Sequence, residues 1–573
     1  MDNQRLLIWA FFGLMLWLAF QAWQQDYGAK PAPPAAATET PEPAAESPAE
    51  PSTTGLPELS EQAAPTPAPV ATETETGSTS VAEQAAPRIH VTTDVLDLEI
   101  SLKGGTIVHA ALPKYPVAKD QPNVPVVLLD PGQENFGLIR TGLRSADADR
   151  PAPGNEAMFT AGRNGYAMGD DETLVVPLSW TDGQGLTVEK RFRFKRGDYA
   201  IEVEQTVHNA SDSDWRGDQY SQILRRFHNV KRSMFNIETY SFAGPQIYNG
   251  ESAEKLKHDD LAKDGPYEFT TDHGWMAAIQ HHFLSAVIPN QGSEHVFRVQ
   301  VADDRMIESV VGAKRTIAPG HEDTFTRTLF IGPKLHKQLE AVTPTLKLTI
   351  DYGWLLTPLS KILFWLLSEV HTIVGNWGVA IILVTALIKL VFYKLTEASG
   401  RSMAKMRNLQ PRLKALQERY KDDKQALSQA MMELYKREKV NPAAGCLPIL
   451  IQMPFFLAFY WVLIESVEMR QAPFALWITD LSSRDPFFIL PLIMGAAMFF
   501  QQRLNPQVGD PVQMKVMQVM PIIFTVFFAF FPSGLVLYWV TNTLLSIAQQ
   551  WKINKVVTAE AKRYQGGKKK AGD

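Results

Sequence analysis

The sequence predicts a membrane α-helical bundle joined to an antiparallel β-sandwich that lies outside the cytoplasm. Three observations predict this fold class. Apolar runs as long as spanning helices occur near both ends of the 573-residue chain. Segments in which apolar and polar residues alternate fill the region between these runs. A stretch rich in proline and alanine separates the first apolar run from the alternating segments and marks a boundary between domains.

The first apolar run, Leu6–Trp23, follows Arg5. No small-residue cleavage site comes after it, so residues 1–26 are interpreted as a retained transmembrane anchor rather than a removed signal peptide. The positive flank places the N-terminus in the cytoplasm. Residues 27–87 are mainly Pro, Ala, Thr and Glu and cannot bury enough apolar surface to fold, so they are predicted to be a disordered linker.

Residues 88–345 are predicted to form the β-sandwich. In the segment YAIEVEQTV, the apolar residues Tyr199, Ile201, Val203 and Val207 are expected to face a core, while the glutamates between them face water. Clusters of Gly, Asn and Asp separate segments of this kind. The region is long enough to bury a core of its own.

The C-terminal third is predicted to be helical. Residues 346–375 are apolar around most of a helix and polar on one side, which favours a helix lying in the membrane interface. Residues 376–552 are predicted to hold five spans, and residues 553–573 a basic cytoplasmic tail. A tight turn at Pro532, Ser533 and Gly534 separates the last two spans. The predicted spans are 376–396, 446–466, 486–502, 517–531 and 535–551.

The distribution of Lys and Arg gives the orientation of the spans. Residues 401–439 carry eleven Lys or Arg against five Asp or Glu, whereas residues 467–485 carry both signs in similar numbers. Because Lys and Arg accumulate in cytoplasmic loops, the first segment is predicted inside and the second outside. A cytoplasmic N-terminus, one span, the sandwich and five further spans reproduce this arrangement. Both termini are therefore predicted to be cytoplasmic.

The cytoplasmic segment 399–440 is predicted to be a helical hairpin. Apolar residues recur at helical spacing on both sides of Asp422 and Asp423. The basic residues of the hairpin either only fix its topology or form a docking surface for a ribosome or targeting factor, whose surfaces are acidic or rich in phosphate. The candidate docking residues are Arg401, Lys405, Arg407, Arg412 and Lys414.

Lys389 lies inside an otherwise apolar span and shares a helix face with Thr385, four residues earlier. A lysine at the centre of a bilayer costs about 2.5–3.5 kcal/mol on insertion scales. Either its stem reaches the cytoplasmic edge near Lys394, or its charge faces a wet cavity. Polar residues of the last span favour a shared hydrophilic pocket, although such residues commonly only join helices. They are Tyr538, Thr541, Asn542, Thr543, Ser546 and Gln549.

The composition excludes several classes of protein. A net charge of -5 argues against a nucleic-acid binder, and no specific nucleic-acid recognition is expected. The single cysteine, Cys446, excludes an internal disulfide framework, and no C-x-x-C or H-E-x-x-H spacing indicates a metal site. No cofactor, metal ligand or catalytic residue is predicted.

Several segments of the C-terminal third resemble the YidC family of membrane protein insertases of the bacterial inner membrane. They are SMAKMRNLQP, ELYKREKVNP, KVNPAAGCLPILIQMPFFLAFY, RQAPFALWITDLS and FPSGLVLYW. The order of anchor, linker, outer domain and five spans resembles the Gram-negative form, which has a large periplasmic domain. The resemblance implies a five-span insertase core that encloses a hydrophilic groove, open to the cytoplasm and to lipid, and no covalent chemistry.

The resemblance also implies roles for individual residues. Lys389 occupies the position of the groove cation, commonly an arginine, and Thr385 that of its polar partner one turn away. The aromatic pair of the last span falls on Tyr538 and on Trp539, which stands where a tyrosine is common. Gln452, a polar residue early in the span 446–466, completes the candidate groove. The apolar positions expected to contact substrate are Phe456, Met494 and Phe528.

The expected function is that of an insertase and chaperone, which inserts, folds and helps to assemble inner-membrane proteins, alone or with the Sec translocon. The expected partners are nascent inner-membrane proteins, the Sec translocon with its accessory subunits, the phospholipid bilayer and a ribosome or signal-recognition pathway. The expected location is the bacterial inner membrane, as a multi-pass protein with its large domain in the periplasm.

Two other functions are considered. A solute transporter or channel with a periplasmic binding domain would favour repeated halves, which the sequence lacks. A membrane-tethered carbohydrate enzyme would need an acid–base pair within residues 88–345. The outer domain of the family resembles a sugar-mutarotase sandwich, but the adjacent His281 and His282 give no basis for catalysis, because lone histidines are more often structural.

Overall fold

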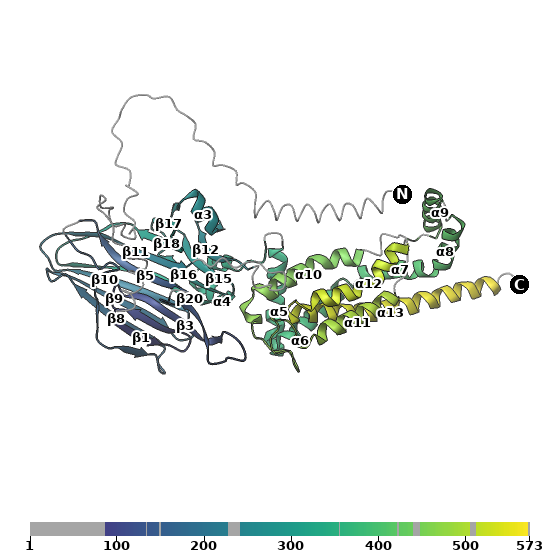
Figure 1. Ribbon diagram of the computed structural model, residues 1–573, viewed down its shortest axis with the longest axis horizontal. Coiled ribbons are helices and arrows are strands. Elements are labelled where there is room, and N and C mark those ends of the chain that lie inside the picture. Colours follow the sequence, from purple (N-terminus) through teal and green to yellow (C-terminus); the bar gives the residue numbers. More distant parts are fainter. Residues whose placement is uncertain are drawn as a thin grey trace, which may run out of the picture.

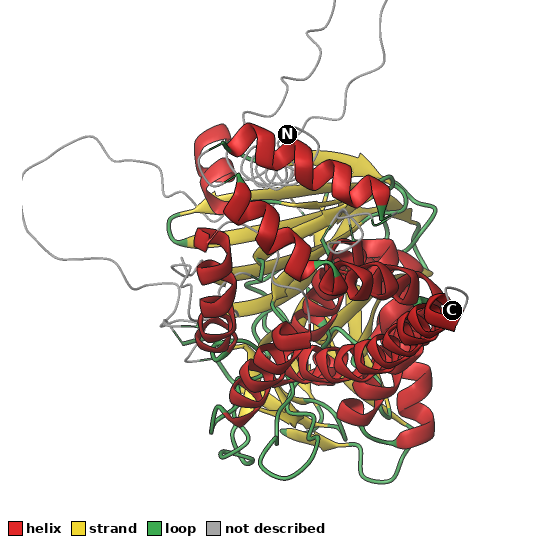
Figure 2. Ribbon diagram, turned by 90° about the vertical axis from the view of Figure 1, so that its right-hand side faces the viewer, coloured by secondary structure: helices red, strands yellow, loops and turns green. Residues whose placement is uncertain are grey.

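The computed structural model describes residues 86–132, 135–147, 150–226, 241–353, 356–420, 423–438, 440, 447–504 and 511–570. The predicted anchor and nearly all of the predicted linker lie outside the described residues. Strands fill the N-terminal part of the described chain and helices the C-terminal part. Figure 1 shows the sheets at one end of an elongated molecule and the helices at the other, and in Figure 2, seen from the helical end, the helices lie in front of the strands.

One sheet of the outer domain holds eleven strands. Its main path runs β14, β17, β18, β11, β5, β3, β2, β1 and β7, with β19 paired to β11 and β4 to β3. The strands are β1 (Arg88–Thr92), β2 (Asp97–Ser101), β3 (Thr106–Pro116), β4 (Pro125–Leu129), β5 (Gly137–Ser145), β7 (Gly165–Ala167), β11 (Trp215–Arg226), β14 (Tyr267–Thr271), β17 (His295–Ala302), β18 (Arg305–Gly312) and β19 (Arg315–Ile317).

The second sheet holds nine strands in the order β13, β12, β15, β16, β20, β10, β9, β8 and β6. They are β6 (Thr160–Ala161), β8 (Thr173–Thr181), β9 (Leu186–Lys195), β10 (Ala200–Asn209), β12 (Ala243–Tyr248), β13 (Ala253–Lys255), β15 (Trp275–Gln280), β16 (Phe283–Pro289) and β20 (His321–Pro333). A short helix, α3 (His258–Asp264), lies between β13 and β14. The expected β-sheet domain followed by a helical region is confirmed.

Alternating side chains place the core between the two sheets. Ile201, Val203 and Val207 on β10, and Tyr199 just before it, are buried, as the period-2 pattern predicts. The expectation of purely antiparallel pairing is wrong at one edge, where β1 and β7 run parallel. Several strands intervene between β1 and β7 in the sequence, and a connection of this length allows the chain to return in the same direction.

Two short helices and a longer one connect the sheets to the helical region. They are α4 (His336–Val342), the 3-10 helix η2 (Pro344–Thr349) and α5 (Thr357–Val374). Helix α5 buries Leu363, Phe364 and Leu367 and exposes Lys361 and Glu369 on its other side, so it is amphipathic as expected. The helix covers only part of the predicted segment 346–375.

The first predicted span of the core is broken. Helix α6 (Trp377–Val391) ends at Val391, and after Phe392 the chain continues as α7 (Tyr393–Asn408) at an angle of 70°. The chain therefore bends within the predicted span 376–396. Of the described helices, none alone has the length and apolarity needed to cross a membrane, whereas the bent pair of α6 and α7 does.

The remaining helices follow the predicted order with different ends. The last predicted span is the first half of the 38-residue α13, which continues through most of the segment predicted as a tail, because residues 552–563 contain few helix breakers. Gly495 lets two helices approach closely, since a Cβ there would lie 2.0 Å from Thr525 Oγ1. The helices are α8 (Gln410–Arg419), α9 (Lys424–Arg437), α10 (Leu447–Glu465), η4 (Val467–Met469), α11 (Ile489–Leu504), α12 (Pro511–Phe528) and α13 (Ser533–Lys570).

The predicted turn before α13 is held by the loop that precedes α11. Ser533 N donates to the Ser483 carbonyl (2.7 Å), and Gly534 N donates to the Leu481 carbonyl (2.9 Å). The hydroxyl of Ser533 also donates to the carbonyl of Asp480 (2.7 Å). These bonds satisfy backbone groups at the N-terminus of α13 and fix its starting point.

Candidate functional site

The candidate site is a polar seam between α6 and α13. On α6, the side chain of Asn376 accepts a hydrogen bond from Val379 N (3.0 Å) and so caps the start of the helix. Lys389 lies in the last turn of α6, where the helix dipole favours a cation. Asn542 and Ser546 are four residues apart on α13 and therefore share one face of that helix.

The ammonium of Lys389 contacts three oxygen atoms of α13. Its Nζ donates to Asn542 Oδ1 (2.8 Å), to the Asn542 carbonyl (3.3 Å) and to Ser546 Oγ. The Ser546 hydroxyl in turn donates to the carbonyl of Asn542 (2.7 Å). Gln549 of α13 donates from Nε2 to the carbonyl of Tyr393, the first residue of α7 (3.3 Å). The half-buried Lys389 is therefore held against α13.

The groups that solvate Lys389 are all uncharged. Among the residues that the structure describes, no carboxylate lies within ion-pair distance of its ammonium. The next two residues, Leu390 and Val391, are 69% and 70% exposed, so the surface beside the cation is apolar. A positive charge that is solvated but not neutralised can attract an anionic group that comes near it.

Thr385 lies one turn before Lys389 and is buried. Its Oγ1 donates to the carbonyl of Ile381 (2.6 Å) in its own helix. Back-bonding of this kind takes up the hydroxyl proton within the helix. Thr385 therefore contributes to the polarity of the α6 face without donating to α13.

An aromatic cluster joins α10, α12 and α13 one turn before Asn542. The rings of Tyr538 and Phe459 stack 4.5 Å apart, and Trp539 meets Phe456 edge to face at 4.9 Å. Phe528 lies 5.3 Å from Trp539 and 6.0 Å from Phe456. The predicted aromatic pair and two of the predicted apolar positions thus lie together in one cluster. We call Phe456, Phe459, Phe528, Tyr538 and Trp539 the aromatic cluster.

Two predicted site residues lie apart from Lys389. Gln452 is half-buried on α10, one turn before Phe456, and the described part of the chain gives it no hydrogen bond to the polar seam. Met494 is fully buried on α11, and Phe528 is almost as buried in the aromatic cluster. A substrate could touch Met494 or Phe528 only after neighbouring helices separate, so their contact with substrate stays a prediction.

The hairpin of α8 and α9 packs around one apolar cluster. Met406, Leu409, Leu413, Leu434 and Tyr435 are buried together there. Most of the candidate docking residues point away from this cluster into solvent. Lys405, Arg407, Arg412 and Lys414 are exposed, whereas Arg401 is half-buried.

Ion pairs take up part of the positive charge of the hairpin. Arg401 bonds to Glu397 (3.0 Å), and Arg412 donates to Glu438 Oε1 (2.7 Å). Within the described chain, Lys405 and Lys414 form no ion pair, so these two cations are available to an external acidic surface.

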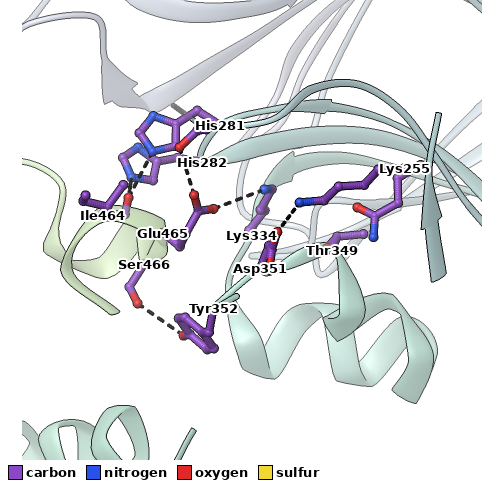
Figure 3. A network of polar contacts seen from close by, with 12 residues as sticks. Lys255, His281, His282, Lys334, Thr349, Asp351, Tyr352, Ile464, Glu465 and Ser466 are labelled. Carbon is purple, nitrogen blue, oxygen red and sulfur yellow. Dashed lines mark hydrogen bonds and ion pairs between the residues drawn. The ribbon is translucent and has the colours of Figure 1, made fainter. Parts of the chain in front are cut away.

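A second polar network joins the outer domain to the end of α10 (Figure 3). The stacked rings of His281 and His282 both point a nitrogen at the carbonyl of Ile464, at 3.0 and 2.7 Å. They therefore satisfy an orphan carbonyl in the last turn of a helix. This contact gives the histidine pair a structural role, and burial holds the pKa of His282 well below its usual value.

Buried charges complete the network. Lys334 Nζ lies 3.9 Å from Glu465 Oε2, and Ser241 donates to the other oxygen of Glu465 (2.9 Å). Burial lowers the pKa of Lys334 to about 8, although the carboxylate of Glu465 opposes that shift. Lys255 bonds to Asp351 nearby, as Figure 3 shows. The outer domain is thus attached to α10 through a network in which Lys334 and Glu465 are buried, whereas Lys255 and Asp351 keep partial contact with water.

A loop of the outer domain contacts the segment after η4. Arg470 Nη2 donates to the carbonyls of Pro116 (2.8 Å) and Val117 (2.9 Å), and Gln471 Nε2 donates to the Pro116 carbonyl (3.0 Å). Lys119 Nζ reaches the carbonyl of Thr479. The outer domain therefore contacts the helical region on both sides of residue 467.

The partners of Lys389 were not among the predicted groove residues. The sequence shows several polar residues in the last span, including Asn542 and Ser546, but it does not show which of them face α6. Their spacing of four residues, equal to that of Thr385 and Lys389, was the available signal. No group of three or more potential metal ligands occurs among the described residues.

Two family models match almost all of the described chain. The model of the YidC periplasmic domain matches residues 88–366, and that of the 60Kd inner membrane protein matches residues 369–561. The Membrane protein insertase YidC of Thioalkalivibrio sulfidiphilus is 46% identical over 98% of this chain and 100% of its own length. The proteins of the same name from Nitrosococcus oceani and Methylococcus capsulatus are 44% and 45% identical, with the same coverage.

Solved structures show a weaker likeness. A crystal structure of an active YidC insertase, with its first transmembrane domain resolved, is 19% identical, with a TM-score of 0.36 over 81% of this chain and 92% of that chain. A galactose mutarotase related enzyme from Lactobacillus acidophilus is 10% identical, with a TM-score of 0.28 over 43% of this chain and 97% of that chain.

Proposed function

This chain belongs to the YidC family of membrane protein insertases, and from that premise we propose that the polar seam at Lys389 receives the polar part of a nascent inner-membrane protein. The protein is an insertase with a periplasmic domain, located in the inner membrane, and it is not an enzyme. Family membership sets aside the transporter and carbohydrate-enzyme alternatives. The proposal concerns how this chain performs insertion.

The uncompensated charge of Lys389 carries the proposal. Its ammonium is solvated by Asn542 and Ser546, and no described carboxylate neutralises it. An acidic segment of a substrate that enters between α6 and α13 would exchange these neutral acceptors for its own carboxylate. A carboxylate adds the attraction of opposite charges to the hydrogen bond, and this attraction is stronger inside the bundle than in water, so the exchange favours entry of the acidic segment.

The surroundings of the seam suit a polar segment that must cross an apolar layer. Each polar group placed inside the bundle shortens the distance over which the substrate lacks hydrogen-bond partners. The membrane potential assists acidic segments with about 2.3 kcal/mol per charge per 100 mV. Hydrogen bonds in the polar seam and the membrane potential together lower the barrier that a polar segment meets when it crosses the membrane, without covalent chemistry.

The apolar part of the substrate is proposed to move along α11 and α12. Ile522, Ile523 and Val526 on α12 are more than half exposed, as are Leu492 and Phe500 on α11. These side chains lie outside the polar seam and suit contact with lipid or with an apolar helix. The aromatic cluster lies beside this surface, because its member Phe528 belongs to α12 and packs against Trp539 of α13 at 5.3 Å.

The proposed topology has both termini in the cytoplasm and six spans. Positive charge on α7, α8 and α9 favours a cytoplasmic hairpin, and the contacts of the sheets with Glu465 and Arg470 suit an outer domain on the opposite side. The exposed cations Lys405 and Lys414 suit docking of a ribosome or targeting factor. Cooperation with the Sec translocon and its accessory subunits is part of the same proposal.

Site-directed photocrosslinking tests this arrangement. A photoreactive amino acid in place of Ser546 should crosslink to the acidic outer tail of a stalled single-span substrate. The same probe in place of Ile522 should crosslink to its apolar segment, and a probe at the exposed Val175 of the outer domain should give neither product. Crosslinks of the acidic tail at Ile522 but not at Ser546 would contradict the proposal.

A further inference from the structure

A polar layer divides the core of the outer domain. Apolar residues between the sheets fall into two separate clusters, a larger one that includes Ile139, Phe192 and Leu329 and a smaller one that includes Trp215 and Phe325. Six buried polar side chains lie at inward positions between them. We call these six residues the polar layer: Thr141, Lys190, Gln205, Gln219, Ser221 and Arg327.

Three adjacent strands of one sheet each contribute one residue to the polar layer. Lys190 on β9 lies between Val188 of the smaller cluster and Phe192 of the larger one. Gln205 on β10 is paired directly with Lys190 and occupies the equivalent position. Arg327 on β20 is opposite Val203, one inward position from Gln205. The three side chains are therefore neighbours on the same face of the sheet.

The facing sheet contributes the other half of the polar layer. Thr141 on β5 is paired with Ser221 on β11, and Gln219 lies at the next inward position of β11. Two hydrogen bonds join the halves. Lys190 Nζ donates to the Thr141 carbonyl (2.6 Å), and Arg327 Nη2 donates to the Gln219 carbonyl (3.3 Å). All six residues are at most 3% exposed, so the layer is closed to bulk solvent.

Many polar atoms of the layer have no partner in the described chain, and most of them are donors. The unpaired nitrogen atoms are Nε and Nη1 of Arg327, Nε2 of Gln205 and Nε2 of Gln219. The unpaired acceptors are fewer: the amide oxygen of Gln205 and the hydroxyls of Thr141 and Ser221. The two hydroxyls can donate as well as accept. The layer therefore has a large excess of N–H donors over acceptors.

The layer also has an excess of positive charge. Lys190 donates to three carbonyls, including those of Gly104 and Gly105, but no carboxylate acts on it. Burial lowers the pKa of Lys190 to about 7 and that of Arg327 to about 9. Glu308 is a buried carboxyl on the neighbouring strand β18, where it lies opposite Ile223 of β11. The cation that acts on Glu308 is Arg225, which is not a residue of the polar layer.

We propose that the polar layer binds a small monovalent anion, such as chloride, between the guanidinium of Arg327 and the amide groups of Gln205 and Gln219. Buried charges in proteins are almost always paired, and an anion would pair with Arg327 and accept from both amides at once. Water would satisfy some donors but would leave the charge uncompensated. The complete enclosure of the layer favours a monatomic anion over a larger one.

Anomalous diffraction tests the site directly. Crystals of the full-length protein soaked in sodium bromide should show an anomalous peak within hydrogen-bonding distance of Arg327 Nη1 or Nε. Ordered density at this place without an anomalous signal would identify water and overturn the proposal. Absence of any density there would overturn it as well.

Thermal unfolding of the full-length protein in detergent gives a second measurement. The unfolding midpoint of the outer domain should rise by about 3 °C when gluconate is replaced by chloride at constant ionic strength. Gln205→Glu places a carboxylate beside Arg327 and Lys190, so this variant should show no chloride effect and should be at least as stable as the wild type in gluconate. A wild-type midpoint that is equal in the two salts, or an undiminished chloride effect in Gln205→Glu, would overturn the proposal.

Two further variants separate the site from general salt effects. Arg327→Met should lose the chloride effect, whereas Arg193→Met, which removes a partly exposed cation from the same sheet, should keep it. If Arg327→Met does not fold, the bromide soak and the Gln205→Glu variant still decide the question. Loss of the chloride effect in Arg193→Met as well would show that surface screening causes it and would overturn the proposal.

Discussion

The ammonium of Lys389 lies 2.8 Å from the side-chain oxygen of Asn542, so the charge on α6 is solvated by a neutral group of α13. A neutral partner supplies a hydrogen bond to Lys389 within the bundle and leaves its charge available to a substrate. A carboxylate at the same place would also stabilise the lysine, but it would cancel the charge.

Asn542→Asp should stabilise the protein and impair insertion. The new carboxylate would pair with Lys389 and compete with the acidic segment of a substrate. A hydrogen bond to a charged group contributes about 1.5–3 kcal/mol, so insertion of a substrate with an acidic tail should slow by about tenfold or more. Insertion in inverted vesicles and the thermal unfolding midpoint would be measured on the same preparation. Insertion at the wild-type rate in a more stable variant would contradict the role given to the free charge.

Lys334→Met should destabilise the junction of the outer domain and α10. It leaves the carboxylate of Glu465 buried without its cation, a change that typically costs about 3–5 kcal/mol. The double variant Lys334→Met, Glu465→Leu removes both charges and should recover most of the loss. The exposed pair of Lys347 and Glu340 offers a control, because Lys347→Met should change stability by less than about 1 kcal/mol. A double variant no more stable than the single one would contradict this account.

The contribution of Glu468 to the stability of the junction should fall as the pH rises from about 4.5 to 7. Burial raises the pKa of Glu468 from 4.5 to about 7, and its Oε2 has no partner in the described chain. Between about pH 4.5 and 7, Glu468 therefore binds more protons in the folded protein than in the unfolded chain, so its contribution to stability decreases with pH there. The effect reaches at most about 3 kcal/mol.

Glu468→Gln should remove this contribution to the pH dependence. Its unfolding midpoint should exceed that of the wild type at about pH 8 and should match it more closely at about pH 5. Glu251→Gln, which changes an exposed carboxylate of the outer domain, should keep the wild-type slope. Parallel midpoint curves for Glu468→Gln and the wild type would show that Glu468 does not cause the dependence.

The double variant Lys405→Glu, Lys414→Glu should weaken ribosome binding. These exposed cations lack ion pairs within the described chain, so reversing them removes attraction to an acidic surface and adds repulsion. Co-sedimentation with ribosomes should fall by about tenfold at low salt, with a smaller difference at high salt. Lys195→Glu on the outer domain reverses a similarly exposed charge and should leave binding unchanged. Equal binding by all three proteins would favour a hairpin whose charges only fix topology.

The periodic parts of the sequence predicted the fold class well. Alternation around Ile201 and Val203 identified an inward strand face, and the apolar stripe around Leu413 identified the packed face of the hairpin. These predictions succeed because burial of apolar side chains follows the period of the backbone. The polar layer shows the limit of the pattern, since Lys190 and Arg327 occupy inward positions that alternation alone assigns to apolar residues.

Other features depend on contacts that sequence patterns do not contain. The apolar run through Val391 continues across the break at Phe392, so composition indicates one span where the chain turns by 70°. The fall in apolarity predicts the end of the last span near residue 551, although α13 continues to Lys570. The role of Asn542 depends on how α13 is rotated against α6, which only the packed bundle determines.

The most direct test of the account compares Lys389→Glu with Lys389→Arg in cells depleted of the wild-type protein. Insertion of a newly made single-span substrate with an acidic outer tail would be followed by protease mapping. Because the account rests on the positive charge at Lys389, the arginine variant should insert at nearly the wild-type rate, and the glutamate variant should be slower by about tenfold or more. Equal insertion by the two variants would contradict the account and leave Lys389 as an anchor of α6 against α13.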